Sequence, residues 1–237
     1  MSDHIVKSFT EQLEMLANAV AQMGGLAEAQ FANAIDAIAK RDTKLAEAAI
    51  GSDERVDRIQ QTVEDQALKV LALRQPMAVD LRTTLAAIKI ANELERIGDL
   101  AKNIGKRVMA LDSEFYPVGL IRGVEHMGSM VLAQLKEVLD SYARHDLKKA
   151  LAVWNGDEEI DAICTSLFRE LLTYMMEDPH HITFCIHLMF CAKNFERMGD
   201  HATNIAETVY YMVEGRAITD QRPKGDTTSF PAGVLQK

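Results

Sequence analysis

A twelve-residue stretch occurs twice in this chain, 101 positions apart. Residues 93–104 read ELERIGDLAKNI and residues 194–205 read NFERMGDHATNI, with seven identities. Upstream, DERVDRI at 53–59 is matched by DEEIDAI at 157–163. A repeat of this length indicates one structural unit that is present twice. Its apolar seam recurs as well, as Ile90, Leu94, Ile97, Ala101, Ile104 and Val108 in the first copy and Cys191, Phe195, Met198, Ala202, Ile205 and Val209 in the second.

Both copies have the sequence pattern of long helices. The chain between the prolines is rich in Ala, Leu, Glu, Gln and Met, and its apolar residues recur with the helical period. Turns are predicted at Pro76 and around Pro179, where the pattern stops. A mild interruption of the first helix is predicted at Gly24 and Gly25. For the second helix, a break near Gly51 is left open as an alternative. The predicted helices run from about Phe9 to Lys40, from Thr43 through Leu73 and from Val79 to Met109, and then near 120–143, 146–176 and 182–213.

Short turns between long amphipathic helices favour antiparallel neighbours. The predicted fold is therefore all-α, with two tandem repeats that are each a three-helix bundle, six long helices in all. The first repeat is expected at 1–112 and the second at 117–213, joined by the linker FYPVG at 115–119. Residues 214–237 are rich in Gly, Pro and polar residues and are predicted to be a flexible C-terminal tail.

Composition excludes several classes of protein. The net charge is −9 and the basic residues are scattered, which argues against binding nucleic acid. The first residues lack a basic head followed by an apolar run, so no signal peptide is predicted. No apolar run is long enough for a spanning helix, which needs roughly 20 residues. Cys164, Cys185 and Cys191 form no CxxC pair and are expected to be reduced core residues of a cytoplasmic protein.

Acidic residues lie at matching distances on both sides of the first turn. Asp57 precedes Pro76 by the same number of positions as Glu95 follows it. Asp53 and Asp99 are likewise equally far from this proline, one helical turn further out. Both helices rise by about 1.5 Å per residue. In an antiparallel hairpin, Asp57 should therefore lie level with Glu95, and Asp53 with Asp99.

The second copy has the same arrangement around Pro179. Asp161 and Glu196 are equally far from this proline to within one position, and so are Asp157 and Asp200. The i,i+4 spacing puts both carboxylates of each helix on one face. The candidate site residues are therefore two sets of four: Asp53, Asp57, Glu95 and Asp99, and then Asp157, Asp161, Glu196 and Asp200.

Four carboxylates this close repel one another, and protonation, a basic partner or a bound cation could relieve the repulsion. Lys102 could reach Asp99, but Thr203 stands in the matching place, so a salt bridge does not explain both copies. A bound cation fits better, because oxygen ligands suit hard ions such as iron, manganese, magnesium or calcium. The alternative stays open, since these acids also lie roughly opposite the apolar seam, where solvated charges belong. His201 follows Asp200, but Leu100 matches it, and a surface position is expected.

ERIGD and ERMGD, each with an Asn four residues after the Asp, together with RQPMAVDLR at 74–82, resemble the PhoU family of bacterial phosphate-signalling regulators. The resemblance covers residues 5 to 213 and includes the doubled three-helix plan. Family members bind metal clusters through E(D)xxxD motifs, which here are Asp53/Asp57, Glu95/Asp99, Asp157/Asp161 and Glu196/Asp200. The resemblance thus implies that the protein binds divalent or trivalent metal ions (iron, manganese, magnesium or zinc) and no organic cofactor.

The resemblance also implies a function. PhoU-like proteins are cytoplasmic, associate peripherally with membrane complexes, and help keep the phosphate-starvation response off when phosphate is plentiful. The partners implied are a phosphate ABC transporter, including its ATPase, and a sensor histidine kinase, which the protein links. A homodimer is also expected, and no nucleic acid.

Two other functions compete with this regulatory adaptor, which would not be an enzyme. The first is a carboxylate-bridged dimetal enzyme, an oxidase or metallohydrolase on a helical bundle. Ferritin-like dimetal sites use Glu-x-x-His motifs, and none lies among these carboxylates. The second, a structural helical protein, is weakened by the short halves and the absence of sustained heptads.

Overall fold

The computed structural model describes residues 2–111, 117–220 and 222, without the side chains of residues 2–7. Within these ranges the regular structure is entirely helical, which confirms the all-α prediction. The predicted linker at 115–119 and the predicted tail at 214–237 lie partly outside the described residues. The first repeat consists of α1 (Ser2–Lys40), α2 (Thr43–Gly51), α3 (Asp53–Arg74) and α4 (Ala78–Ala110), and the second of α5 (Val118–Arg144), α6 (Leu147–Asn155), α7 (Asp157–Glu177), the 3-10 turn η1 (Pro179–His181) and α8 (Ile182–Glu214).

Each repeat has three helical arms, of which the middle arm is broken into two helices. The break expected near Gly51 is found at Ser52, between α2 and α3. The uninterrupted helix predicted at 146–176 is wrong, because α6 ends at Asn155 and α7 begins at Asp157. Gly156 lies between them, where the side chain of Gln134 packs so closely that a Cβ on Gly156 would lie 2.8 Å from its Nε2.

The middle arms of the two repeats begin in the same way. The carboxylate of Asp42 accepts hydrogen bonds from the backbone N–H groups of the second and third residues after it, at 2.8 and 3.3 Å. Asp146 does the same at 2.9 and 3.3 Å. An aspartate at this position satisfies N–H groups that have no partner inside the helix. The N-caps therefore repeat together with the helices that they begin.

The predicted interruption of the first helix does not occur, and α1 starts before Phe9. Gly24 lies inside α1, where it faces α5. A Cβ on Gly24 would lie 3.0 Å from Leu139 Cδ1, so the glycine lets the two helices approach closely. This glycine serves the packing between the repeats and not a break in the helix.

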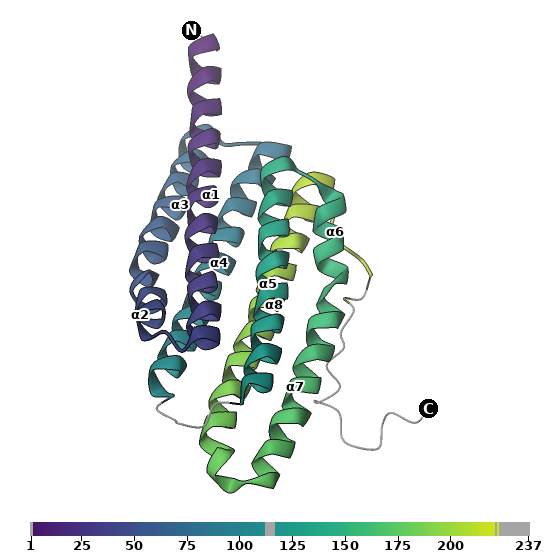
Figure 1. Ribbon diagram of the computed structural model, residues 1–237. Helices are drawn as coiled ribbons and strands as arrows, with labels where there is room; N and C mark the ends of the chain where they lie inside the picture. Colours follow the sequence, from purple (N-terminus) through teal and green to yellow (C-terminus); the bar gives the residue numbers. More distant parts are fainter. Residues whose placement is uncertain (1, 112–116, 221, 223–237) are drawn as a thin grey trace.

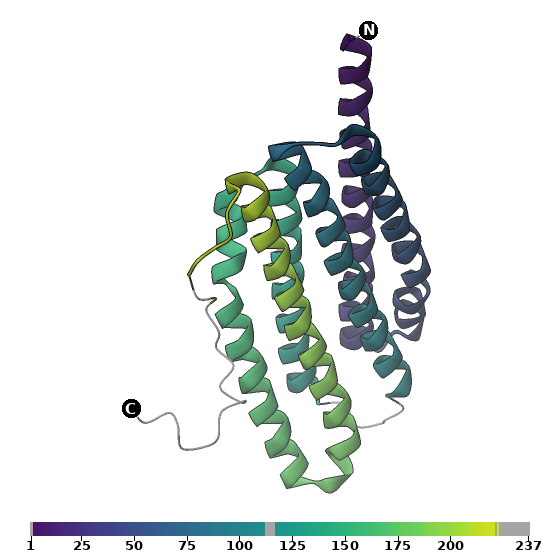
Figure 2. The ribbon, with the colours of Figure 1, turned by 180° about the vertical axis from the view of Figure 1, so that it is seen from behind.

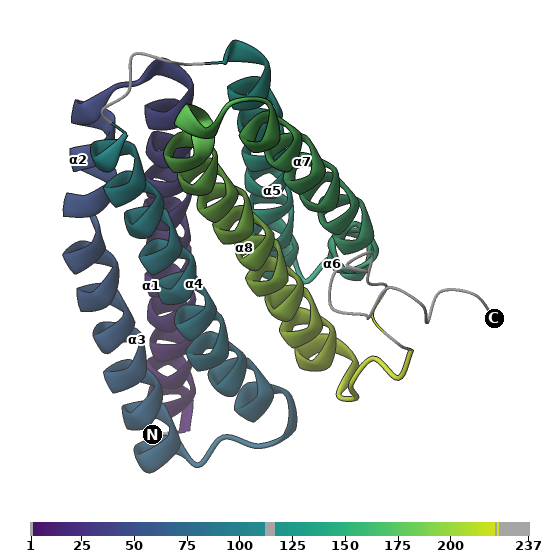
Figure 3. The same ribbon diagram turned by 90° about the horizontal axis from the view of Figure 1, so that it is seen from below.

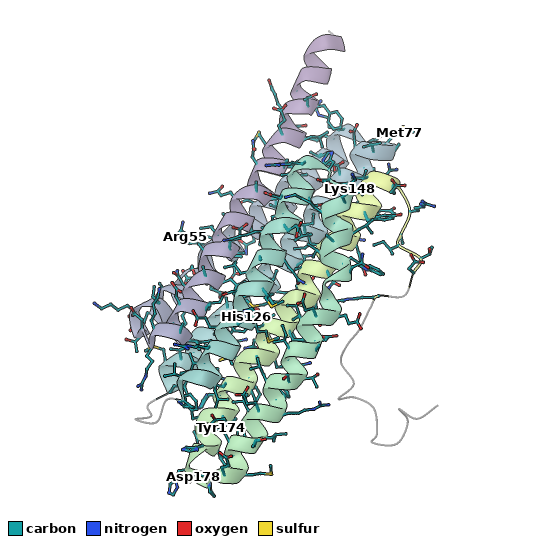
Figure 4. All side chains as sticks on the ribbon, turned by 45° about the vertical axis from the view of Figure 1, so that its right-hand side comes forward. Arg55, Met77, His126, Lys148, Tyr174 and Asp178 are labelled. Atoms are coloured by element: carbon teal, nitrogen blue, oxygen red, sulfur yellow. The ribbon has the colours of Figure 1, made fainter. Side chains whose placement is uncertain are left out.

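The four long helices α1, α4, α5 and α8 lie in the middle of the molecule, with α2 and α3 on one flank and α6 and α7 on the other (Figures 1 and 3). The repeats meet along α4 and α8 and along α1 and α5. Their turns lie at opposite ends, as the labelled Met77 and Asp178 show (Figure 4). The view from behind shows α4 and α8 side by side over most of their length (Figure 2).

A single hydrophobic core runs through both repeats. All twelve seam positions identified in the sequence are buried in it, and so are the three cysteines. The rings of Phe31 in α1 and Phe195 in α8 stack with their centroids 5.5 Å apart, which joins the first repeat to the second. None of the described helices is long and apolar enough to span a membrane.

Candidate metal centres

The first centre consists of Asp53 and Asp57 at the start of α3 and of Glu95 and Asp99 in the last half of α4. The pKa of Asp57 is raised by burial and by the negative charges of Asp53 and Asp99. The pKa of Glu95 is raised by burial and by the other three carboxylates, although Arg96 acts to lower it. The hairpin therefore brings these four side chains within electrostatic reach of one another.

Lys102 is the main positive partner of the first centre. Its ammonium group donates a hydrogen bond to Asp53 Oδ2 and lies 3.7 Å from Asp99 Oδ1. Arg96 folds back over the same helix, with Nε 3.4 Å from Glu95 Oε2. Lys102 thus joins the two helices of the hairpin, because Asp53 comes from α3 and Asp99 from α4.

The second centre has the same plan in the other repeat. Asp157 and Asp161 come from the start of α7, and Glu196 and Asp200 come from α8. The pKa of Glu196 is raised by burial and by the charges of Asp200 and Asp161, while Lys193, with Nζ 2.9 Å from Glu196 Oε2, acts to lower it. These contacts place the four carboxylates of the second repeat in one cluster.

A residue that follows α8 supplies the second positive partner of this centre. Arg222 Nε donates to Asp157 Oδ2 at 2.9 Å, and a terminal nitrogen of the same guanidinium donates to Asp200 Oδ1 at 2.6 Å. Although burial acts to lower it, the pKa of Arg222 is raised by its hydrogen bond to Asp157 and by the charges of Asp157 and Asp200. The arginine therefore stays charged and joins α7 to α8.

Burial distinguishes these clusters from a solvated acidic face. Water hardly reaches half of the carboxylates, and a buried carboxylate is unstable unless it is paired. The other four are only half-buried. A solvated charge run therefore does not describe the four buried carboxylates, whereas the four half-buried ones remain in contact with water. The buried ones are Asp53, Asp157, Asp161 and Glu196, with 6%, 3%, 6% and 8% of their surface exposed.

His201 lies between the repeats and not at the exposed surface where the sequence placed it. Its Nδ1 is 2.6 Å from Glu93 Oε2, which also accepts a hydrogen bond from Asn204 Nδ2 at 3.1 Å. Although burial acts to raise it, the pKa of Glu93 is lowered by these two hydrogen bonds. The cluster ties α4 to α8 and is separate from the eight carboxylates.

The comparisons with known proteins agree with the repeat and its motifs. The family described as "PhoU domain" matches this chain twice, at residues 20–108 and 124–209. The chain belongs to the PhoU family. Among its PhoU relatives, the "Phosphate-specific transport system accessory protein PhoU homolog" of Caulobacter vibrioides is 52% identical over 229 residues, which cover 97% of this chain and 100% of that protein. The relative of the same name from Rhizobium meliloti is 52% identical over 98% of each chain.

A solved PhoU structure has the same fold. The crystal structure of PhoU from Pseudomonas aeruginosa superimposes with a TM-score of 0.83 and 36% sequence identity, over 88% of this chain and 100% of that chain. The two-repeat helical architecture is therefore shared with a PhoU protein of known structure.

The donor set of this PhoU-family chain suits a hard cation. Each centre offers four carboxylates, which bind such ions through oxygen, and burial together with the neighbouring negative charges raises the pKa of Asp57, Glu95 and Glu196. Among the described residues, however, no group of three or more acidic, His or Cys side chains is arranged to hold an ion. Lys102 and Arg222 instead bridge the carboxylates. The residue types suit a metal ion, but an ion would have to replace these basic side chains.

Sequence reasoning missed two of the residues that complete the centres. Lys193 lies three residues before Glu196 on the same helix, and this i,i+3 spacing is a signal that could have identified it. Arg222 lies 22 positions after Asp200 in a segment predicted to be a flexible tail, and no sequence period connects the two. Only the three-dimensional structure assigns Arg222 to the second centre.

Proposed function

We propose that this chain is a regulatory accessory protein of a phosphate-specific transport system and helps keep the phosphate-starvation response off while phosphate is plentiful. The observation that carries this proposal is the 52% identity to a PhoU accessory protein over the whole of that relative. A regulator of this kind acts by binding other proteins, so we propose that the chain is not an enzyme. Its place would be the cytoplasm, in peripheral contact with membrane complexes.

The proposed partners are components of the phosphate ABC transporter, including its ATPase, and a sensor histidine kinase that the chain links to it. Exposed apolar side chains next to both turns support protein binding, because such patches often mark interaction surfaces. Leu85 near the start of α4 and Ile186 near the start of α8 occupy matching positions and are exposed. Beside Ile186 lies an apolar groove of about 470 Å³, lined also by Phe168, Met189, Phe190 and Lys193.

We further propose that the eight carboxylates hold metal ions. Asp53, Asp57, Glu95 and Asp99 would hold the first ion or cluster. Asp157, Asp161, Glu196 and Asp200 would hold the second. A bound iron, manganese, magnesium or zinc ion would supply positive charge between the helices of each hairpin. The protein residues themselves orient the oxygen ligands and exclude water from the buried carboxylates, which are Asp53 in the first centre and Asp157, Asp161 and Glu196 in the second.

Deletion of the gene in its own bacterium tests the regulatory function. Transcription of phosphate-starvation genes in phosphate-rich medium should rise on deletion and fall again when the gene is returned on a plasmid. Unchanged transcription would contradict the proposal.

Photo-crosslinking tests the proposed partners. A photo-crosslinking amino acid in place of Ile186 should capture transporter or kinase subunits in phosphate-rich cells. The same amino acid at Lys136 of α5, which is also exposed, should not capture them.

Elemental analysis of the purified protein tests the metal sites. The double variant Glu95→Ala, Asp99→Ala should contain about half as much metal per chain as the parent, because one of two centres is lost. Equal metal content would refute the assignment. Steady hydrolysis of phosphoesters that disappears in Glu196→Ala would favour the alternative function of a dimetal enzyme.

The expected homodimer has its own test. Light scattering of the purified protein should give the mass of two chains.

A further inference from the structure

In both centres, one basic side chain bridges the same pair of carboxylates. In the first centre the pair is Asp53 and Asp99, and Lys102 contacts both. Asp53 is the first residue of α3 and Asp99 lies in α4, so this bridge joins the two helices far from the turn that connects them. Lys102 belongs to α4 itself, three residues after Asp99. The first centre therefore carries its positive charge as a fixed part of its own helix.

The second centre lacks a basic residue at the corresponding helical position. Thr203 stands there, and its hydroxyl lies 3.3 Å from Asp157 Oδ1 and 3.1 Å from the carbonyl oxygen of Gly199. A neutral hydroxyl provides no charge for the carboxylates of Asp157 and Asp200, which match Asp53 and Asp99. Arg222 provides that charge by bridging this pair. The arginine therefore replaces the missing lysine from a different part of the chain.

The segment that carries Arg222 follows α8, and the structure describes its residues 215–220 and 222. This segment is attached to the body of the protein by its own contacts. Gly215 ends α8 in the left-handed conformation, with φ of 75°, which turns the chain away from the helix axis. Ile218 is half-buried and packs against the hydrophobic core. The described part of the segment leaves α8 on the side where α6 lies (Figures 1 and 2). The side chain of Arg222 is only 17% exposed, so it lies inside the centre and not on its surface.

We infer that the C-terminal segment docks into the second carboxylate centre through Arg222, and that a metal ion entering this centre displaces the segment. The guanidinium and the ion need the same carboxylate oxygens, so they exclude each other. A tethered side chain acts as a competitor at an effective concentration in the millimolar range. Displacement by the ion rests on the metal sites proposed above, whereas docking of the segment rests on the described contacts alone.

This competition makes the two centres unequal. In the first centre, an ion displaces a lysine that stays on α4 and leaves the course of the backbone unchanged. In the second centre, an ion releases a whole segment of chain from the face of α7 and α8. Occupation of the second centre is thereby converted into a change in shape that a partner protein can detect.

A calorimetric titration of metal-stripped protein with Mn²⁺ tests the competition. Arg222→Gln removes the competitor, and we expect binding at the second centre to tighten by about tenfold or more. Binding at the first centre should not change. Arg216→Gln is the matched control, since this arginine lies in the same segment, is 74% exposed and pairs with Glu214 at 3.8 Å. Equal affinities in the parent and in Arg222→Gln would overturn the competition.

A spin label tests the docking of the segment without any metal. The three native cysteines are buried, so a cysteine introduced as Thr219→Cys can be labelled selectively. Its spectrum should show a slow label in the parent and in Arg216→Gln, and a faster one in Arg222→Gln. Addition of diamagnetic Mg²⁺ to the parent should have the same mobilising effect as the substitution.

The outcomes separate the inference from the proposed function. A label that is equally mobile in the parent and in Arg222→Gln would overturn the docking, whatever the metal content. Absence of Mn²⁺ binding in every variant would refute the metal sites and, with them, the displacement. A slow label in the parent that becomes fast in Arg222→Gln would even then support the docking of the segment.

Discussion

Replacement of Lys102 by alanine should destabilise the metal-free protein through the carboxylates that it leaves behind. Lys102 bridges Asp53, whose side chain is 8% exposed, and Asp99, which is half-buried. Breaking a buried ion pair costs about 3–5 kcal/mol, whereas an exposed pair contributes at most about 1 kcal/mol. The side chain of Lys102 is itself 29% exposed, so the cost of removing it should lie between these two limits. We expect a loss of about 2 kcal/mol in the free energy of unfolding.

Urea denaturation and thermal unfolding of the metal-stripped protein at pH 7 measure this loss, because urea carries no charge that would screen the ion pair. A loss of about 2 kcal/mol should lower the melting temperature by about 4–8 °C for a chain of this size. Lys40→Ala is a suitable control, because Lys40 pairs with Asp36 at 2.8 Å on an exposed face of α1 and should have no resolvable effect. Equal unfolding midpoints for the two variants would show that Lys102 does not neutralise the first centre, and the reasoning would fail.

Four further substitutions test other parts of the structure. Burial and Arg107 lower the pKa of His187, so its contribution to stability is present above about pH 6.5 and is lost as the pH falls toward the lowered value. His187→Gln should therefore flatten the dependence of the unfolding free energy between pH 7 and 5, and an unchanged slope would contradict the shift. Phe31→Ala should cost about 3–5 kcal/mol and leave one cooperative transition, since the ring packs on Phe195 across the repeats; two separate transitions in calorimetry would show that the repeats unfold independently. Asp42→Ala and Asp146→Ala should each cost about 1 kcal/mol, with additive effects in the double variant because the caps lie in different repeats. Clear non-additivity in urea denaturation would reveal a coupling that the structure does not contain.

The sequence was informative wherever position along a helix determines position in space. The apolar seam follows from the helical period, the turns at Pro76 and Pro179 from the prolines that end the helical pattern, and the grouping of Asp57 with Glu95 from an equal rise per residue on both sides of the turn. The break at Gly156 could not be read in this way, because the close packing of Gln134 against this glycine comes from a different helix. Helical periodicity therefore predicted the arms but not every interruption in them.

The positive side of each centre was harder to predict than the acidic side. The carboxylates repeat, and repetition made them visible in the sequence. Their basic partners do not repeat, since the first centre uses Lys102 and the second uses Arg222 from beyond α8. Because a charge can be neutralised from any direction, the position of its partner is a property of the folded chain and not of the motif.

The single core shared by the two repeats makes them depend on each other for stability. Separation of the repeats would expose the apolar faces of α4 and α8 to water, together with the rings of Phe31 and Phe195. The turns of the repeats point in opposite directions, as in a symmetric pair (Figure 4). Neither repeat therefore buries all of its apolar surface alone, and each completes the core of the other.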